Sequence, residues 1–266
     1  MDWSKIKTIF ILTFLILDVY LLYQFMEIRD ANKYEFIMKA SIEDKLKLDE
    51  IQIDVELPKA PIKDQYLSAK PKMFANADTE NLEGEKRQVK NPSTTLQVIL
   101  EKPIQLNVKF EPSELTSFIN DSVLFGEEYQ FWKKDDEKKV IIYFQKYKGM
   151  PLYENISGKL TFNYNSENQI VSYDQSYLEE IDELKEKEEI LTPLQAIETL
   201  HQKGVLKPKS KITKIELGYS TLIQLAASQV LAPTWRFVVD NGESLFVNAF
   251  EGHIIQFNSD ENRDLE

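Results

Sequence analysis

The sequence predicts an α+β fold that follows a single N-terminal transmembrane helix. An unbroken apolar segment lies between residues 8 and 25. Two helix starts follow, at Pro112 and Thr192, and each precedes a run of strands with alternating apolar and polar residues. A helix followed by an antiparallel sheet, occurring twice, places helices on one face of the sheet. We therefore expect a membrane anchor and two helix-plus-sheet units.

The apolar segment at residues 8–26 is long enough to cross a hydrocarbon core as a helix. A cleavable signal peptide is the alternative, but its apolar region is shorter and ends in small residues, whereas this segment runs directly into Glu27. Lys5 and Lys7 precede the span, so the positive-inside rule keeps residues 1–7 in the cytoplasm. We expect an uncleaved, single-pass anchor in the cell membrane, with the rest of the chain extracytoplasmic.

The composition fits an exported domain. The chain has 266 residues, of which 42% are hydrophobic and 29% charged, and it contains no cysteine. Packing alone must therefore stabilise the fold, without disulfides. The net charge of -12 argues against binding to nucleic acid or to anionic lipid headgroups.

Asp18 lies near the middle of the predicted span. A carboxylate at that depth costs about 2.5–3.5 kcal/mol on insertion scales, which the flanking Leu, Ile and Phe residues offset. One interpretation is a protonated or snorkelling side chain without a partner. The other is a polar contact with another transmembrane helix, because intramembrane polar groups usually face protein. Asp18 is thus the candidate partner contact within the membrane.

Residues 27–50 are expected to form a helical stalk. Apolar residues recur there at helical spacing, at Ile28, Ala31, Tyr34, Ile37 and Met38. Of these, Ile28, Tyr34 and Met38 are candidates for a contact with a partner stalk. Packing of this apolar stripe on the chain's own domain is the alternative. A capping-box pattern that begins at Ser41 predicts that a second short helix starts there.

Three further segments are expected to make up the extracytoplasmic region. Residues 51–110 are strand-rich and punctuated by prolines, with alternation in IQIDVEL at 51–57 and TLQVIL at 95–100. Residues 111–184 form the first α+β unit, a helix that begins at Pro112 and four strands. Its apolar positions are Leu115, Phe118, Ile119 and Val123.

Residues 185–266 form the second α+β unit. Thr192, Pro193 and Gln195 predict a capped helix start, and Gly204 predicts its end. Strands follow, with Asn241-Gly242 as a type I′ hairpin signal between two of them. The closing hairpins of the two units, residues 160–173 and 245–257, match in order, which indicates an internal repeat.

An acidic run lies between the two units, at Glu179, Glu180, Asp182, Glu183, Glu186, Glu188 and Glu189, interleaved with Lys185 and Lys187. Such a run is usually a solvated face or a linker, so we expect it to mark the boundary between the units. Catalytic carboxylates need a raised pKa and a shaped cleft, and a charged linker provides neither.

No catalytic set is apparent in the sequence. The two histidines, His201 and His253, have no metal-ligand spacing, and there is no cysteine to complete a site. The motif G-x-S-x-G and Gly-rich phosphate loops are absent. We therefore expect a protein that is not an enzyme and needs no cofactor or metal.

Most aromatic residues of the strands are expected in the sheet core. They are Tyr129, Phe131, Trp132, Tyr143, Phe144, Tyr147, Trp235, Phe237 and Phe246. Trp3 is expected at the inner membrane interface.

Three stretches of the chain resemble the YycI family of membrane-anchored regulators. They are MDWSKIKTIFILTFLILDVYLL at the N-terminus, the internal KYKGMPLYENISGKLTF, and APTWRFVVDNGESLFVNAFEGHII near the end. The resemblance implies partnership with YycH and with the sensor histidine kinase YycG, also called WalK, in control of cell-wall metabolism. The C-terminal unit also resembles a PepSY-type module, which implies a YycH/PepSY-like fold.

Three hypotheses of function follow. The first is an accessory regulator of a two-component sensor kinase that acts through the transmembrane helix and the outer domain. The second is a cell-envelope enzyme, which the missing catalytic sets disfavour. The third is an extracytoplasmic module that binds a wall-derived or peptide ligand, and it is compatible with the first.

Overall fold

The computed structural model describes residues 3–58, 60–75, 86–89, 94–225, 227–240 and 242–257. Side chains are described for these residues except at positions 4, 5, 9, 25, 27–41 and 86–89. The chain forms two compact units by its internal contacts. One comprises Met1–Gln52 with Lys207–Ser210, and the other Ile53–Leu206 with Lys211–Glu266.

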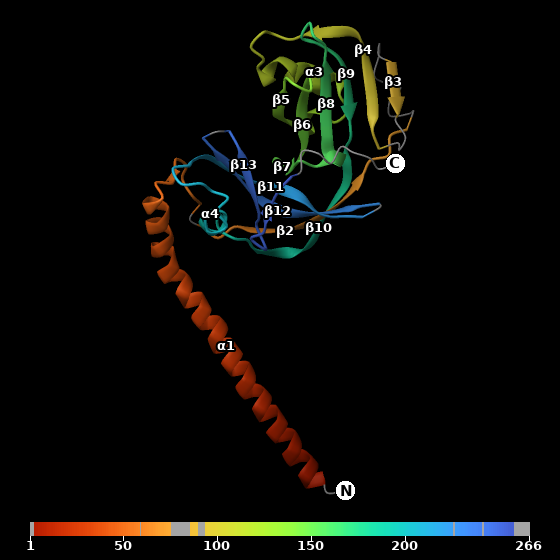
Figure 1. Cartoon of the computed structure of the whole chain (residues 1–266). Helices are drawn as coiled ribbons and strands as arrows, with labels where there is room; N and C mark the ends of the chain where they lie inside the picture. The colour runs from red at the N-terminus through yellow and green to blue at the C-terminus, as the bar shows by residue number, and fades with distance from the viewer. Residues whose placement is uncertain are drawn as a thin grey trace. The chain divides into compact units, whose positions relative to one another are not determined.

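The first unit is dominated by a single helix, α1 (Trp3–Leu48), of 46 residues (Figure 1). The expectation that a second helix starts at Ser41 is wrong, because the helical hydrogen bonds continue past this local capping pattern. The helix ends seven residues later, where Glu50 adopts a left-handed φ of 56°. The N–H of Ile51 donates to the carbonyl of Leu46 at 2.8 Å, and the N–H of Glu50 to that of Lys47 at 3.1 Å, which is a Schellman ending.

The second unit contains two sheets. The first sheet has the strand order β5-β6-β8-β9-β4-β3, with every neighbouring pair antiparallel. Its strands are β3 (Lys86–Val89), β4 (Leu96–Gln105), β5 (Tyr129–Asp135), β6 (Val140–Tyr147), β8 (Lys159–Tyr164) and β9 (Gln169–Gln175).

The second sheet is built around the long strand β12. Its N-terminal part pairs with β2 and its C-terminal part with β13, while β11 pairs along its other side. The strands are β1 (Gln52–Ile53), β2 (Lys63–Pro71), β10 (Leu178–Glu189), β11 (Lys211–Gln224), β12 (Gln229–Val239), β13 (Ser244–Asn248) and β14 (Ile254–Ile255). The strand β10 pairs with β2, and β14 with β13.

The short strand β7 (Met150–Tyr153) joins the sheets, because it pairs antiparallel with β6 and parallel with β11. A buried amide network reinforces the junction. The Asn155 Nδ2 donates to the Gln229 Oε1 at 2.7 Å and to the Thr221 Oγ1 at 2.9 Å. The Gln229 Nε2 donates to the Ser157 Oγ at 2.7 Å. These bonds satisfy polar groups that would otherwise be buried without partners.

One helix packs on each sheet. A 3₁₀ turn at Pro112–Leu115 leads into α3 (Thr116–Ser122), and two further 3₁₀ turns lie at Gly126–Glu128 and Ile156–Gly158. Leu115, Ile119 and Val123 are buried in one core with residues of β4, β6, β8 and β9, and Phe118 packs against it. The helix α4 (Pro193–Gln202) buries Ala196, Ile197 and Leu200, whereas Leu194, which its apolar spacing places with Ile197 and Leu200, is half-buried.

The predicted repeat of a helix and an antiparallel sheet is confirmed. The order α3-β5-β6-β8-β9 recurs as α4-β11-β12-β13-β14, with consecutive strands of each series paired antiparallel. The predicted capping box is present at Thr192, whose Oγ1 accepts from the Gln195 N–H. Asn241 lies outside the described residues, but the β12–β13 hairpin that it was expected to form is present.

Two expectations about strands are corrected. The acidic run is not a linker, because it forms β10, an edge strand that pairs with β2 along most of its length. Two irregularities in that pairing and its exposed charges suit an edge strand, which must avoid pairing with other chains. Alternation at 51–57 yields only the two residues of β1. The expected domain boundaries near residues 27, 51, 111 and 185 stay predictions.

Candidate functional site

The candidate membrane contact lies within α1. The segment Ile6–Gln24 has a mean hydropathy of 2.0 and is long and apolar enough to cross a membrane. Asp18 falls inside it, and the described side chains of this segment are exposed. Ile28, Tyr34 and Met38 also lie in α1, but their side chains are outside the described part of the chain. Their role as a stalk contact stays a prediction.

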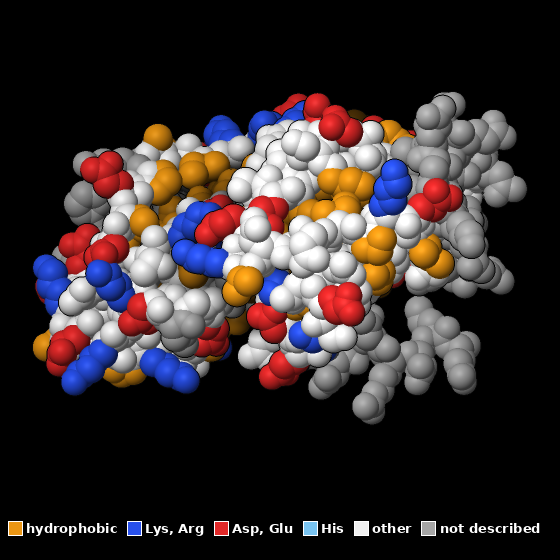
Figure 2. Space-filling model, turned by 90° about the horizontal axis from the view of Figure 1, so that it is seen from above, with side chains coloured by type: hydrophobic (Ala, Val, Ile, Leu, Met, Phe, Trp, Pro, Cys, Tyr) orange, Lys and Arg blue, Asp and Glu red, His pale blue; other side chains and the backbone are white. Residues whose placement is uncertain are grey.

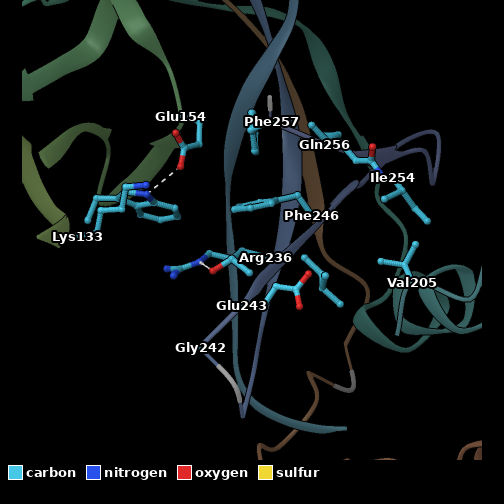
Figure 3. A pocket seen from close by; sticks show the side chains of 14 residues that line it. Lys133, Glu154, Val205, Arg236, Gly242, Glu243, Phe246, Ile254, Gln256 and Phe257 are labelled. Atoms are coloured by element: carbon cyan, nitrogen blue, oxygen red, sulfur yellow. Dashed lines mark hydrogen bonds between the residues drawn. The ribbon is translucent and has the colours of Figure 1, made fainter. Parts of the chain in front are cut away.

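A cleft of about 830 Å³ lies in the second unit, between the edge of the first sheet and one face of the second. Figure 3 shows its lining, with Phe246 at the centre, Lys133 and Glu154 on one side and Ile254 and Val205 on the other. Residues distant in sequence thus converge, which is typical of binding sites. Figure 2 shows hydrophobic side chains gathered in patches among interspersed acidic and basic ones on the viewed face.

The floor of the cleft is a row of directly opposed residues across four strands. Glu216 on β11 pairs with Arg236 on β12, Arg236 with Phe246 on β13, and Phe246 with Ile255 on β14. Trp235 precedes Arg236 and is buried, with its indole N–H donating to the Leu191 carbonyl at 2.8 Å. Because side chains alternate along a strand, Arg236 projects from the opposite face into the cleft.

Arg236 is fixed by contacts on three sides. Its Nη1 donates to the Glu216 Oε2 at 2.9 Å, and its Nε to the Ser244 Oγ at 3.0 Å. Its guanidinium carbon lies 4.2 Å from the centroid of the Trp132 ring, a cation–π contact. Lys214 also contacts Glu216, at 2.7 Å. Glu216 therefore holds Arg236 in place and shares its carboxylate with Lys214.

Trp132 reaches the cleft from β5 because of a β-bulge. The register of β5 against β6 shifts between Phe131 and Lys133, so Trp132 is the additional residue. Bulges commonly redirect a side chain in this way. The Trp132 Nε1 donates to the Glu154 Oε1 at 2.9 Å. Glu154 has a φ of 48°, a left-handed conformation that is uncommon outside glycine.

Tyr153 lies beneath this group and is only 1% exposed. Its ring contacts those of Trp132, at 6.0 Å between centroids, and Phe246, at 5.3 Å. Its hydroxyl has no hydrogen-bond partner among the described residues. Burial raises the pKa of the Tyr153 phenol above its ordinary value, so it stays neutral at physiological pH.

The sequence anticipated only part of this site. Of the aromatic residues expected in the core, Trp235 and Phe246 are buried, whereas Trp132 is half-buried in the cleft. The sequence analysis did not identify Arg236. Its position between the buried Trp235 and Phe237 indicates a charged side chain on the opposite face of the sheet. Glu154 carried no signal in the sequence.

The histidines lie apart from the cleft lining. The His253 Nδ1 is 3.1 Å from the Glu251 Oε2 on the surface, and His201 lies in the last turn of α4. Among the described residues, no group of three or more histidine or acidic side chains is arranged to hold a metal ion.

Comparison with known proteins adds a decisive match. The family model YycI, described as YycI protein, matches residues 31–250. The chain belongs to the YycI family. Family membership points to a membrane-associated, non-enzymatic accessory protein of the YycFG two-component system, and the apolar segment of α1 is its candidate anchor. No curated protein matches this YycI-family chain significantly.

Solved structures with distant similarity to this YycI-family chain include three bacterial proteins. An uncharacterized protein from Eubacterium rectale has 12% identity and a TM-score of 0.43, covering 79% of this chain and 92% of that one. YycH from Bacillus subtilis has 14% identity and a TM-score of 0.41, covering 74% of this chain. The match spans 54% of the YycH chain. The C-terminal domain of Bacillus megaterium YpeB has 12% identity and a TM-score of 0.42, and the match covers 68% of this chain and 92% of the YpeB domain.

Proposed function

We propose that this chain is a membrane-anchored accessory regulator of a sensor histidine kinase of the YycG/WalK type. It acts with a YycH-like membrane protein to modulate signalling in cell-wall homeostasis. The YycI match over residues 31–250 carries the proposal. In this arrangement residues 1–7 are cytoplasmic, and the sheet-containing part of the chain lies outside the membrane, in accord with Lys5 and Lys7 before the span.

The proposed mechanism depends on the continuity of α1. The helix runs on from the candidate span to Leu48, so its 24 residues after Gln24 extend about 36 Å at about 1.5 Å per residue. A contact of Asp18 with the kinase's transmembrane helices biases two arrangements of those helices. Such control requires contacts that differ between the two states, and a few kcal/mol of differential binding is sufficient.

The test of the anchor is a co-purification from native membranes. The full-length chain is compared with a variant in which an unrelated apolar helix replaces residues 8–25. Recovery of the kinase and a YycH-like protein only with the native helix supports regulation through the membrane. Recovery with both chains moves the contact to the outer domain. Recovery with neither chain contradicts the proposal.

Asp18 is tested separately by substitution. We expect Asp18→Leu to weaken regulation of kinase-dependent transcription without lowering membrane insertion, because the intramembrane polar contact is lost. Val19→Leu is the matched control, since Val19 is the exposed neighbour on another side of the helix. Transcription that is equal in the two variants would remove Asp18 from the mechanism.

The stalk is tested by photo-crosslinking. A benzophenone amino acid at Tyr34 is expected to crosslink to a partner's stalk, whereas the same group at Ala40 is not. At about 100° per residue, Ala40 lies about 120° or more around the helix from each of the three stalk candidates. Equal crosslinking at both positions would contradict a specific stalk interface that includes Ile28, Tyr34 and Met38.

A second candidate function is an extracytoplasmic ligand-binding module. The cleft at Arg236 and Phe246 favours it, because its lining combines apolar side chains with a few fixed polar groups. This function is compatible with the first, since an accessory regulator can also bind a ligand.

A further inference from the structure

The strand β13 extends beyond the end of β14. Both residues of β14 are paired, Ile254 with Val247 and Ile255 with Phe246. Ser244 and Leu245 of β13 lie beyond this pairing, and among the described strands β12 is their one neighbour. Both residues line the cleft, so this uncovered part of the β13 edge borders it.

The strand β14 presents its edge to the cleft. Ile254, Ile255, Gln256 and Phe257 all line it, although only alternate residues of a strand share one face. Both residues of the short strand β14, and Gln256 and Phe257 that follow it, therefore border the cavity. Among the described residues, β14 pairs with β13 alone. An edge strand presents unpaired N–H and C=O groups that can template another strand.

A second sheet edge borders the same cleft. Among the described strands, β5 pairs only with β6, and its residues Trp132 and Lys133 line the cavity. The cleft therefore lies between edges that belong to two different sheets. Its volume of about 830 Å³ falls in the usual range for ligand sites.

The aromatic rings of the cleft leave little open face for a sugar. The guanidinium of Arg236 covers Trp132, while Phe144 packs against the same ring at 5.6 Å between centroids. Phe246 is only 6% exposed and contacts the Phe257 ring at 4.8 Å. Arg236 already donates to Glu216 and Ser244 and stacks on Trp132, which limits the donors that it can offer to an anionic ligand. These contacts favour recognition through backbone hydrogen bonds and apolar contacts.

We propose that the cleft binds an extended peptide segment of a partner protein, which adds as a strand to β13 at Ser244 and Leu245, beyond the end of β14. In this β-augmentation, main-chain hydrogen bonds supply affinity, and alternate side chains of the peptide contact the apolar lining. Ile254 and Phe257 are both partly exposed and provide that lining. The inference goes beyond the proposed function, since it holds whichever protein the membrane helix contacts.

The test begins with the full-length chain in detergent micelles and a phage-displayed library of random peptides. A selected peptide is synthesised with a fluorophore, and its affinity is measured by fluorescence anisotropy. We expect apolar residues at alternate positions. The backbone N–H groups of alternate peptide residues point to opposite edges of the added strand. N-methylation of the set that faces β13 should weaken binding about tenfold or more, whereas N-methylation of the other set should be tolerated, because only one edge of the peptide pairs. Failure to select any peptide, or tolerance of both methylated sets, would overturn the proposal.

Two variants locate the site. Ile254→Ser and Phe257→Ser should each weaken the selected peptide about fivefold or more, because each removes apolar contact in the cleft. Ile156→Ser is the matched control, since Ile156 is 65% exposed and lies outside the lining residues. Equal affinity in all three variants would place the peptide elsewhere and overturn the proposal. Thermal unfolding of each variant establishes that it folds.

Hydrogen exchange tests the same site without any substitution. Peptide binding should slow amide exchange in residues 244–245 and 254–257, which line the cleft. Slowing confined to other segments would overturn the proposal. A N-acetylglucosamine–N-acetylmuramic acid disaccharide serves as the glycan probe. If it slows exchange at these amides and the peptide does not, the cleft is a glycan site.

Discussion

The guanidinium of Arg236 stacks on the indole of Trp132 across the junction of the two sheets, 4.2 Å from the ring centroid. Arg236 belongs to the second helix-plus-sheet repeat, and Trp132 belongs to the first. Glu154, next to the connecting strand β7, accepts the indole N–H. The contact thus links the repeats at the cleft, beside the parallel pairing of β7 with β11.

A double-mutant cycle measures the strength of that stack. We expect Trp132→Leu and Arg236→Met to show a coupling of about 1 kcal/mol in the free energy of unfolding, since the pair is partly desolvated. Urea unfolding of the full-length chain in micelles, followed by near-ultraviolet circular dichroism, provides the measurement.

An exposed cation–π pair serves as the control for this cycle. Lys148 lies 5.1 Å from the Tyr147 ring centroid, and its side chain is exposed. The cycle of Tyr147→Leu with Lys148→Met should give a coupling below about 0.5 kcal/mol. Equal couplings in the two cycles would mean that the Arg236 stack adds nothing to the junction.

Asn155 is expected to be important for the junction of the sheets. It is 2% exposed and bonds to Thr221 and Gln229. Asn155→Ala should lower the free energy of unfolding by about 2–3 kcal/mol, because the Gln229 oxygen loses its donor while still buried. Asn163→Ala is the control, since Asn163 is half-buried and bonds to Ser172 and Asp174 at 3.2 Å. A loss equal to or smaller than that of the control would contradict this role.

The lowered pKa of Lys159 predicts that the stability of the protein depends on pH. Burial lowers the pKa of its ammonium group below the ordinary 10.5, and the nearby Glu154 offsets this only in part. Between the lowered folded-state pKa and about 10.5, the unfolded chain binds more protons, so this residue's contribution to stability rises with pH. Below the folded-state pKa the desolvation cost is fully present.

The measurement compares Lys159→Met with the unchanged chain by urea unfolding at several pH values. The variant should be more stable at neutral pH, and its advantage should vanish above about pH 10.5, where the lysine is neutral in both states. Lys138→Met, at an exposed turn, should change stability little at any pH. An advantage of Lys159→Met that persists unchanged at high pH would show that packing, not charge, causes it.

Local signals in the sequence predicted the elements that depend on neighbouring residues. The α4 start at Thr192 and Gln195 was confirmed because a capping box needs only residues three apart. The strand β10 was misread, since its acidic residues resemble a solvated linker and only the pairing with β2 stabilises them as a strand. Charged residues are typical of edge strands, but sequence alone does not reveal an edge.

The cleft could not be predicted because it depends on long-range register. A single bulge places Trp132 in it, and β14 ends at Ile255, which leaves the edge of β13 at Ser244 and Leu245 uncovered. Bulges and strand ends leave no reliable pattern in one strand's sequence. The Arg236 contact with Trp132 joins residues of two sheets, which β7 links through its pairing with β11.

A substitution at Gly218 tests most directly whether β7 holds the two sheets together. A Cβ atom at this position would lie 2.4 Å from the Pro151 carbonyl oxygen and 2.6 Å from the Tyr153 ring, where β7 pairs with β11. Gly218→Ala must therefore push β7 away, and we expect a loss of about 1–3 kcal/mol in the free energy of unfolding. Gly158→Ala is the graded control, because its new Cβ would meet side chains and no backbone, at 3.1 Å from Gln145 and 3.7 Å from Leu178. If β7 holds the sheets in place, Gly218→Ala should also reduce the coupling between Trp132 and Arg236. A destabilised variant with an unchanged coupling would instead mean that the stack forms independently of β7.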